Sequence, residues 1–440
     1  MKFRFLYFAL APFLSSLILI FYFDINPFLD ISRYYFQGDG LLSQKYIKNL
    51  IINSSFFCSK QLAYPVLDTN CFRDFVLDHL YLNILIIFLI KFFTNDPLLI
   101  VLIYDFFCII FIALITNVVL LKFSISKTLS CLISIFFAVS QNQVNFINQI
   151  GPNNFFMVSF GFLMIFWFYN NQVNFIKFDS SKKLIFSSNK YFYIILIMGL
   201  CAIISFSYYA YLLLIYLIFA FIIVWLKNGK FTIQNLNIVM YFIIFVYCAF
   251  LVCLPTIIFW LKYGYLDIIG RNYATWYYFE LSIMSLLLPV ENHYLENFGK
   301  FSQSYISAFK IQDFELVNFK SGFFAMFGYF FLIGFSIKSI ILKKIGNSKE
   351  NLTFLGVKFT PNRLDLLKFF SVIALLTFLY FSSGGFYRIT HFFYSQFRGI
   401  CRFNLIFTLL GLIFWGIYFD QLIEQQKQRK KQLILKILVT

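Results

Sequence analysis

The sequence predicts an all-α, polytopic transmembrane bundle of about 10 or 11 helices. Three observations predict this class. Hydrophobic residues make up 61% of the 440 residues, charged residues only 12%, and the mean hydropathy is +0.79; soluble globular domains are about 45–50% apolar and about 25% charged. The apolar residues gather in runs of roughly 17 to 25, the length of a helix that crosses a bilayer. Lys and Arg concentrate in the loops on one side of these runs.

The apolar runs are expected to be helices because backbone groups in lipid must be satisfied within the segment itself. The first run, Phe5–Phe23, follows a short basic flank, and bulky residues in place of a small-residue cleavage site favour an uncleaved span over a signal peptide. Leu433–Thr440 begins a further run that breaks off, as expected of a piece of a longer chain. The whole of 1–440 is treated as one transmembrane domain, with expected spans at about 5–23, 97–121, 128–141, 154–169, 191–205, 207–226, 236–259, 321–342, 367–383 and 403–420.

The basic residues predict the orientation of the chain. With the N-terminus in the cytoplasm, 22 of the 36 Lys and Arg residues fall on the inner side, on short loops. This is the positive-inside pattern of a plasma (inner) membrane protein. It explains the net charge of +17, so no nucleic-acid partner is expected.

Three long loops then face outward: 24–96, 262–320 and 383–402. Reading Leu80–Phe93 as an eleventh span would turn the Lys-rich loop 170–190 outward, so this segment is expected to lie as a helix on the outer membrane surface. Leu41–Asn53 is expected to be similar, because its apolar and polar residues fall on opposite faces of a helix.

The first outer loop holds seven of the nineteen carboxylates, and Asp39 is its leading catalytic candidate. Gly38 and Gly40 flank it, and glycine lets a backbone turn tightly and approach a ligand. An ordinary Asp-Gly turn is the alternative. The position beside the bilayer favours the functional interpretation.

A second group in this loop is Asp68, Asp74, Asp78 and His79. Asp74 and Asp78 would share a helix face and could bind a divalent cation, Mg²⁺ or Mn²⁺, together with Asp39. A solvated edge paired with Arg73 is the slightly favoured alternative, and no cofactor is required.

Two cysteines, Cys58 and Cys71, also lie in the first outer loop. In an oxidising compartment they could form a disulfide. Two free thiols are the alternative, and the sequence leaves both open.

Arg388, His391, Arg398 and Arg402 lie just outside the last two spans. Arginine matches phosphate oxygens with two parallel hydrogen bonds, so this group is expected to bind a lipid-linked phosphate. Anchoring to anionic headgroups is the alternative. Asp105 lies inside a span, where an acid is either functional or hydrogen-bonded to a neighbouring helix.

Five stretches resemble the GT-C superfamily of polyprenyl-phosphate-sugar-dependent glycosyltransferases, and within it the YfhO-like bacterial membrane proteins. They are GDGLLSQ (38–44), Pro65–His79, NQIGPNNFF (148–156), ELSIMSLLLPVENH (280–293) and GGFYRITHFFYSQFRGICRF (384–403). The resemblance implies that Asp39 serves as base or metal ligand and that a polyprenyl phosphate carries the donor sugar. The paired Asp-Glu of better-known branches is absent after the first span, so Asp24 and Asp30 remain rivals.

Together these features predict a membrane glycosyltransferase with an extracytoplasmic site. One carboxylate as base and arginines on the departing phosphate would suffice for inverting transfer, with Asp24, Asp74 and Asp78 as supporting acids. His79, Arg271 and His293 are expected to line the substrate pocket, and the acceptor would be a glycan, lipid or protein. A lipid-linked sugar flippase or another transporter is the alternative; an assembly protein without chemistry is the third.

Overall fold

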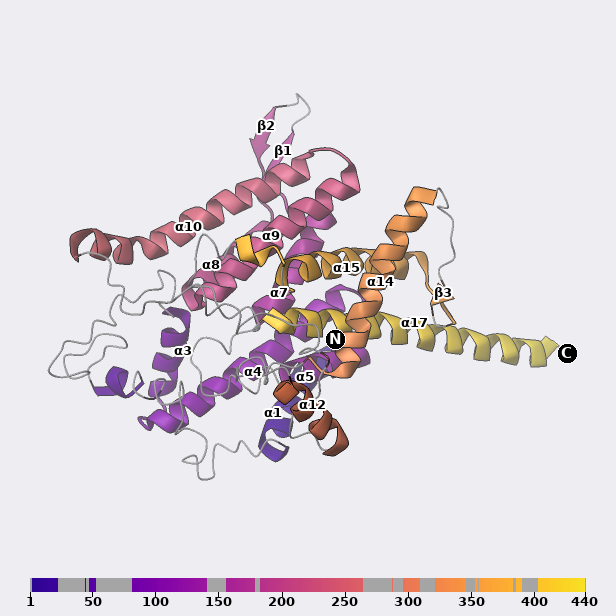
Figure 1. Cartoon of the computed structure of the whole chain (residues 1–440), viewed down its shortest axis with the longest axis horizontal. Coiled ribbons are helices and arrows are strands. Elements are labelled where there is room, and N and C mark those ends of the chain that lie inside the picture. The colour runs from indigo at the N-terminus through magenta and orange to yellow at the C-terminus, as the bar shows by residue number, and fades with distance from the viewer. Residues whose placement is uncertain are drawn as a thin grey trace. The chain divides into compact units, whose positions relative to one another are not determined.

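The computed structural model describes residues 2–22, 44, 47–52, 81–140, 156–178, 183–263, 287, 296–308, 321–345, 353–354, 356–382, 385–389 and 403–439. These residues are almost entirely helical, with two short antiparallel hairpins (Figure 1). The helices are α1 (Lys2–Phe21), α3 (Tyr81–Lys91), α4 (Pro97–Lys122), α5 (Lys127–Ala138), α7 (Phe156–Tyr169), α8 (Lys190–Ser205), α9 (Ser207–Asn228), α10 (Ile233–Tyr263), α12 (Glu296–Ala308), α14 (Phe323–Ile345), α15 (Pro361–Phe381) and α17 (Asn404–Val439). The strands are β1 (Ile176–Phe178), β2 (Leu184–Phe186), β3 (Thr353–Phe354) and β4 (Val357–Lys358).

The chain is a multi-pass helical membrane protein. Within the described residues, five helices are long and apolar enough to cross a bilayer: Pro97–Lys122, Tyr208–Asn228, Ile233–Ile258, Pro361–Phe381 and Asn404–Gln428. Each of the other expected spans coincides with a shorter apolar helix, in α1, α5, α7, α8 and α14. The prediction that these segments are helical is therefore confirmed. That about ten of them cross the membrane stays a prediction.

Helix α17 is much longer than the expected span 403–420. Its 36 residues correspond to about 54 Å at 1.5 Å per residue. The polar residues after Asp420 stay helical because Gln, Glu, Lys and Arg are good helix formers. The apolar run from Leu433 is thus the last part of the same helix.

The β1–β2 hairpin was not expected in the loop 170–190. Ile176 lies opposite Phe186, and Phe178 lies opposite Leu184. A side chain of α10 holds the hairpin: the side-chain oxygen of Asn237 accepts hydrogen bonds from the backbone N–H groups of Phe175 and Ile176, at 3.0 and 2.8 Å. Three-residue strands are too short for their alternation to be read from the sequence.

The two helices expected on the outer surface are both partly described. Helix α3 has 11 residues, about 16 Å, which is too short to cross a bilayer. It exposes large apolar side chains and buries Asn83, the reverse of what solvent would favour. Residues 47–52 are also helical, but Asn49, expected on the polar face, is buried.

The chain divides into two compact units. Unit 1 comprises 1–11, 116–145 and 272–440, and unit 2 comprises 12–115 and 146–271. In unit 2, α7 packs on α9, and α8 and α10 pack on each other and on α9. Helix α7 can approach α9 closely because Gly161 has no side chain: a Cβ there would lie 1.9 Å from the Tyr216 ring.

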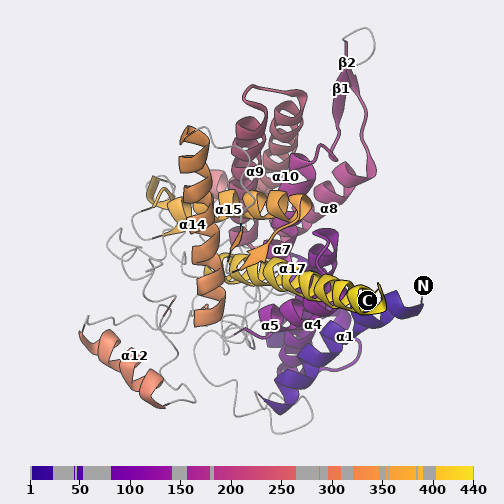
Figure 2. The ribbon, with the colours of Figure 1, turned by 90° about the vertical axis from the view of Figure 1, so that its right-hand side faces the viewer.

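In unit 1, α14 crosses α15 and α17 (Figures 1 and 2). Glycines allow the crossing, since a Cβ on Gly411 of α17 would lie 1.7 Å from the carbonyl oxygen of Ala325 on α14. Deeper in this bundle, the Tyr329 hydroxyl donates to the carbonyl oxygen of Ala374 on α15 at 2.9 Å.

Candidate functional site

Most of the sequence-predicted site residues lie outside the described part of the chain. These are Asp24, Asp30, Asp39, Asp74, Asp78, His79, Arg271, His293, His391, Arg398 and Arg402, together with Cys58 and Cys71. Their roles stay predictions. Arg388 is described: it is exposed in a short turn after α15, and its backbone N–H donates to the carbonyl oxygen of Gly385 at 3.2 Å.

The predicted cation site also falls outside the described residues. Among the residues that are described, no group of three or more His, Cys, Asp or Glu side chains is placed to hold a metal ion. The Mg²⁺ or Mn²⁺ expectation at Asp39 with Asp74 or Asp78 is therefore neither supported nor opposed.

Asp105 lies within α4 and is only 2% exposed. Its neighbour Tyr104 is fully buried and donates its hydroxyl to the side-chain oxygen of Asn83 at 3.0 Å. The Asn83 amide nitrogen in turn donates to the backbone carbonyl of Ser205, the last residue of α8, at 3.0 Å. This chain of hydrogen bonds joins α3, α4 and the α8–α9 corner (Figure 1).

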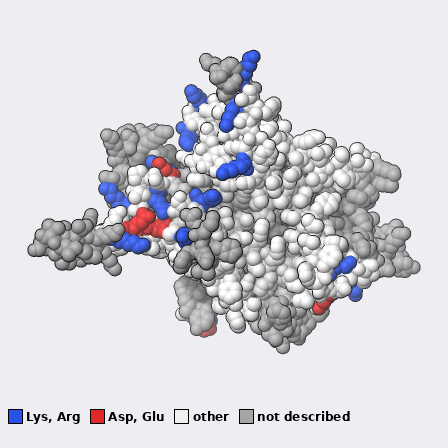
Figure 3. All heavy atoms as spheres, turned by 180° about the vertical axis from the view of Figure 1, so that it is seen from behind, with Lys and Arg blue, Asp and Glu red and all other residues white. Residues whose placement is uncertain are grey.

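One end of unit 2 carries a group of lysines. They lie on the β1–β2 hairpin, at the start of α8, at the end of α9 and before α10, and no described residue at this end is acidic (Figure 3). Lys227 caps the carboxyl end of α7: its Nζ lies 2.8 Å from the carbonyl oxygen of Tyr169 and 3.9 Å from the centroid of the Tyr169 ring. We call Lys177, Lys183, Lys190, Lys227 and Lys230 the lysine end.

The opposite end of unit 2 contains α3. Helix α8 begins at the lysine end and finishes at Ser205, to which Asn83 of α3 bonds. Its 16 residues separate the two ends by about 24 Å. The segment 24–80, which carries the predicted acids, therefore leads into the end of unit 2 that lies away from the lysines.

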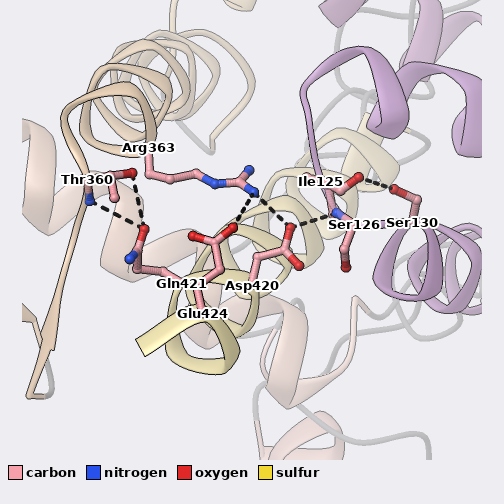
Figure 4. Close-up of polar contacts among 8 residues, drawn as sticks. All are labelled: Ile125, Ser126, Ser130, Thr360, Arg363, Asp420, Gln421 and Glu424. Atoms are coloured by element: carbon pink, nitrogen blue, oxygen red, sulfur yellow. Dashed lines mark hydrogen bonds and ion pairs between the residues drawn. The ribbon is translucent and has the colours of Figure 1, made fainter. Parts of the chain in front are cut away.

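In unit 1, a buried ion pair joins three helices (Figure 4). Arg363 of α15 donates to the Asp420 carboxylate of α17 at 3.0 Å, and their side chains are only 12% and 5% exposed. The same Asp420 oxygen accepts from the backbone N–H of Ser126, the capping residue just before α5, at 2.7 Å. The more exposed Glu424 lies 4.0 Å from Arg363. Charge neutralisation and hydrogen bonding together make this burial tolerable.

The next residue of α17 acts on the start of α15. Gln421 accepts hydrogen bonds from the backbone N–H and the hydroxyl of Thr360, both at 3.3 Å (Figure 4). Neither Ser126 nor Thr360 caps its own helix through its side chain. Consecutive side chains of α17 thus satisfy backbone donors at the starts of α5 and α15.

A third buried polar group is Asn404, the first residue of α17. It is fully buried, and neither its amide oxygen nor its amide nitrogen has a hydrogen-bond partner. Its backbone carbonyl, in contrast, accepts from Thr408 at 3.2 Å and from Ser321 at 3.5 Å.

Sequence reasoning missed Asn83, Asn404 and the Arg363–Asp420 pair. For the two asparagines a signal was available, because each interrupts or borders an apolar helix where an amide is costly. Arg363 and Asp420 are 57 residues apart, and nothing in the sequence pairs them.

Models of protein families, curated proteins and solved structures were all compared with the chain, and none matches it significantly.

Proposed function

We propose that the protein is a membrane glycosyltransferase of GT-C type that transfers a sugar from a polyprenyl-phosphate donor to an acceptor on the extracytoplasmic side. Asp39 is the base, and Arg388, Arg398, Arg402 and His391 bind the donor phosphate. The multi-pass helical architecture and the acid-rich first loop support the proposal.

The observation that best supports this proposal is the location of α3 in unit 2. Asn83 ties α3 to the end of the unit opposite the lysine end. By the positive-inside rule, lysines gather on the cytoplasmic side. The acidic segment that leads into α3 would then face outward, where a lipid-linked donor meets its acceptor.

The chemistry needs few groups. The acceptor oxygen attacks the anomeric carbon, the bond from that carbon to the phosphate oxygen breaks, and the acceptor proton passes to Asp39. The phosphate leaves with both electrons of the broken bond, stabilised by the arginines. Attack on the face opposite the phosphate inverts the anomeric centre. A positioned base contributes about 10²–10⁴-fold to such a step.

The first test is Asp39→Asn, assayed in membranes by release of polyprenyl phosphate from radiolabelled polyprenyl-phosphate hexose. We expect transfer to fall about 10²–10⁴-fold, with expression and donor binding unchanged. Asp365→Asn is the control, because it makes the same change at an exposed carboxylate of α15 outside the predicted site. Full activity of Asp39→Asn would exclude Asp39 as the base, and loss in Asp24→Asn or Asp30→Asn would reassign the role.

The orientation is tested separately with single cysteines in a variant that lacks the native ones. Lys183 and Asn95 are both exposed; they lie at the hairpin and between α3 and α4. We expect a membrane-impermeant maleimide to label Asn95→Cys in intact spheroplasts and Lys183→Cys only after permeabilisation. The reverse pattern would put the acidic loop in the cytoplasm and overturn the proposal.

A lipid-linked sugar flippase is the second candidate, and the burial of Asp105 within α4 favours it, since acids inside spans often mark transport pathways. Reconstituted vesicles separate the two functions. Movement of lipid-linked sugar across the bilayer without transfer to any acceptor would favour the flippase. Transfer that survives Asp105→Asn would favour the glycosyltransferase.

A further inference from the structure

We infer that Asn404 binds a pair of hydroxyl groups on the sugar of the lipid-linked donor. The inference rests on the proposed glycosyltransferase function and adds a sugar-recognition residue that the sequence did not indicate. It starts from a buried amide that nothing in the folded chain satisfies.

Asn404 does neither of the two tasks that asparagine usually does at a helix start. As an N-cap, its side-chain oxygen would accept from a backbone N–H two or three residues later. In the helix itself, the amide could bond to a nearby backbone carbonyl. Instead, both amide atoms are buried without a partner.

The other fully buried asparagines show how unusual this is. Asn83 and Asn237 use both ends of the amide. Asn235 does so as well, with Phe221 and Thr232. Asn117 uses its nitrogen, which donates to the carbonyl oxygen of Tyr7 at 2.9 Å. Among the buried amides of the described residues, Asn404 alone has both ends unpartnered.

The chemistry of the amide selects the ligand. A carboxamide presents donors and an acceptor side by side. An ionised phosphate offers acceptors only, so it would leave the amide oxygen unsatisfied. Two neighbouring hydroxyls of a sugar offer both: one accepts from the amide nitrogen and the other donates to the oxygen. A hexose therefore offers a partner to each end of the Asn404 amide.

The place in the fold agrees with this assignment. Asn404 begins α17, and its backbone carbonyl accepts from Ser321, which lies two residues before the start of α14. The Arg363–Asp420 pair lies 16 residues further along α17 than Asn404, or about 24 Å. Asn404 is therefore at the end of this bundle away from that ion pair, and it lies two residues after the segment 383–402 that carries the predicted phosphate-binding arginines.

Because the amide is covered in this structure, a ligand has to displace the side chains that cover it. The hydroxyls of Ser321 and Thr408 are already used by the Asn404 backbone carbonyl. They bond to the Asn404 backbone, while both ends of its side-chain amide stay without a partner.

The experiment uses the full-length protein in detergent and three variants. Asn404→Leu removes the amide at similar volume. Asn117→Leu is the control, since it makes the same change at a buried asparagine of unit 1 that has a partner. The probes are polyprenyl-phosphate hexose and sugar-free polyprenyl phosphate, measured by equilibrium binding and by the shift in melting temperature. Asn404→Asp keeps an acceptor but loses the donor.

We expect Asn404→Leu to bind the sugar-bearing lipid about 10-fold or more weakly and to bind sugar-free polyprenyl phosphate as the wild type does. Its ligand-free melting temperature should rise, on the order of 2 °C, because an unsatisfied amide has been removed. Asn117→Leu should melt earlier and keep the preference for the sugar-bearing lipid. Asn404→Asp should bind the sugar more weakly than wild type.

Three results decide against the inference in different ways. Unchanged sugar preference in Asn404→Leu would overturn it and leave the proposed function standing. A lower ligand-free melting temperature in Asn404→Leu would show that the amide has a partner within the fold, and would also overturn it. If neither lipid binds the wild type, the proposed glycosyltransferase function fails, and the sugar-binding role of Asn404 fails with it.

Discussion

Asp420→Ala is expected to lower the free energy of unfolding by about 3–5 kcal/mol, the usual cost of leaving a buried charge without its partner. Arg363 would keep its charge with its side chain only 12% exposed, facing, among the described residues, only the half-exposed Glu424 at 4.0 Å, and its second guanidinium nitrogen, Nη1, already lacks a hydrogen bond. The backbone N–H of Ser126, the capping residue before α5, would lose its acceptor as well.

The measurement is the thermal midpoint of the purified protein in detergent, together with denaturant unfolding. Asp365→Ala is the matched control: its carboxylate is 72% exposed and lies 3.8 Å from Lys368. Exposed pairs of this kind contribute about 0.2–1 kcal/mol. Equal midpoints for the two variants would mean that Asp420 does not hold these helices together. The double variant Asp420→Ala with Arg363→Met should recover part of the loss, since it removes the unpaired charge.

Gly411→Val is expected to destabilise the protein by about 3 kcal/mol or more, the upper range for overpacking. A Cβ at this position would lie 1.7 Å from the carbonyl oxygen of Ala325, a backbone atom that cannot rotate away. Gly328 of α14 is also constrained, since its Cβ would lie 2.3 Å from the carbonyl oxygen of Gly411. Small residues on both helices are what permits so close a crossing.

Gly334→Ala provides the control for this prediction. Gly334 is also in α14, but nothing lies within 4 Å of the position its Cβ would take. Alanine is a better helix former than glycine by up to about 1 kcal/mol, so the control should be neutral or slightly stabilising. The check is the melting temperature and the yield of folded protein. Wild-type behaviour of Gly411→Val would mean that α14 and α17 do not cross at these glycines.

The helices were predictable where the physics is local. An apolar run such as Pro97–Lys122 must be helical in lipid, whatever surrounds it. The short α3 was also anticipated, because treating it as a span would have reversed every later loop. These helices were predicted from local composition and from loop charge, and neither depends on which other segments pack against them.

The polar contacts inside the bundle were not predictable for the opposite reason. Ser126 and Asp420 are 294 residues apart, and their pairing depends on how α5 and α17 pack. Asn83 lies in a helix that the sequence places on the membrane surface, and only the packing of α3 against α8 and α4 shows it to be buried. The predicted catalytic acids lie outside the described residues, so for them the sequence remains the only guide.

Side chains of α17 accept hydrogen bonds from backbone N–H groups at the starts of α5 and α15. This dependence affects the order in which unit 1 can form. A ribosome adds about 5–20 residues per second, so the 294 residues between Ser126 and Asp420 take about 15–60 s to synthesise. During that interval the backbone N–H of Ser126 has no Asp420 carboxylate to bond to and must find another acceptor. The contacts that complete the starts of α5 and α15 in unit 1 therefore form late, when α17 arrives.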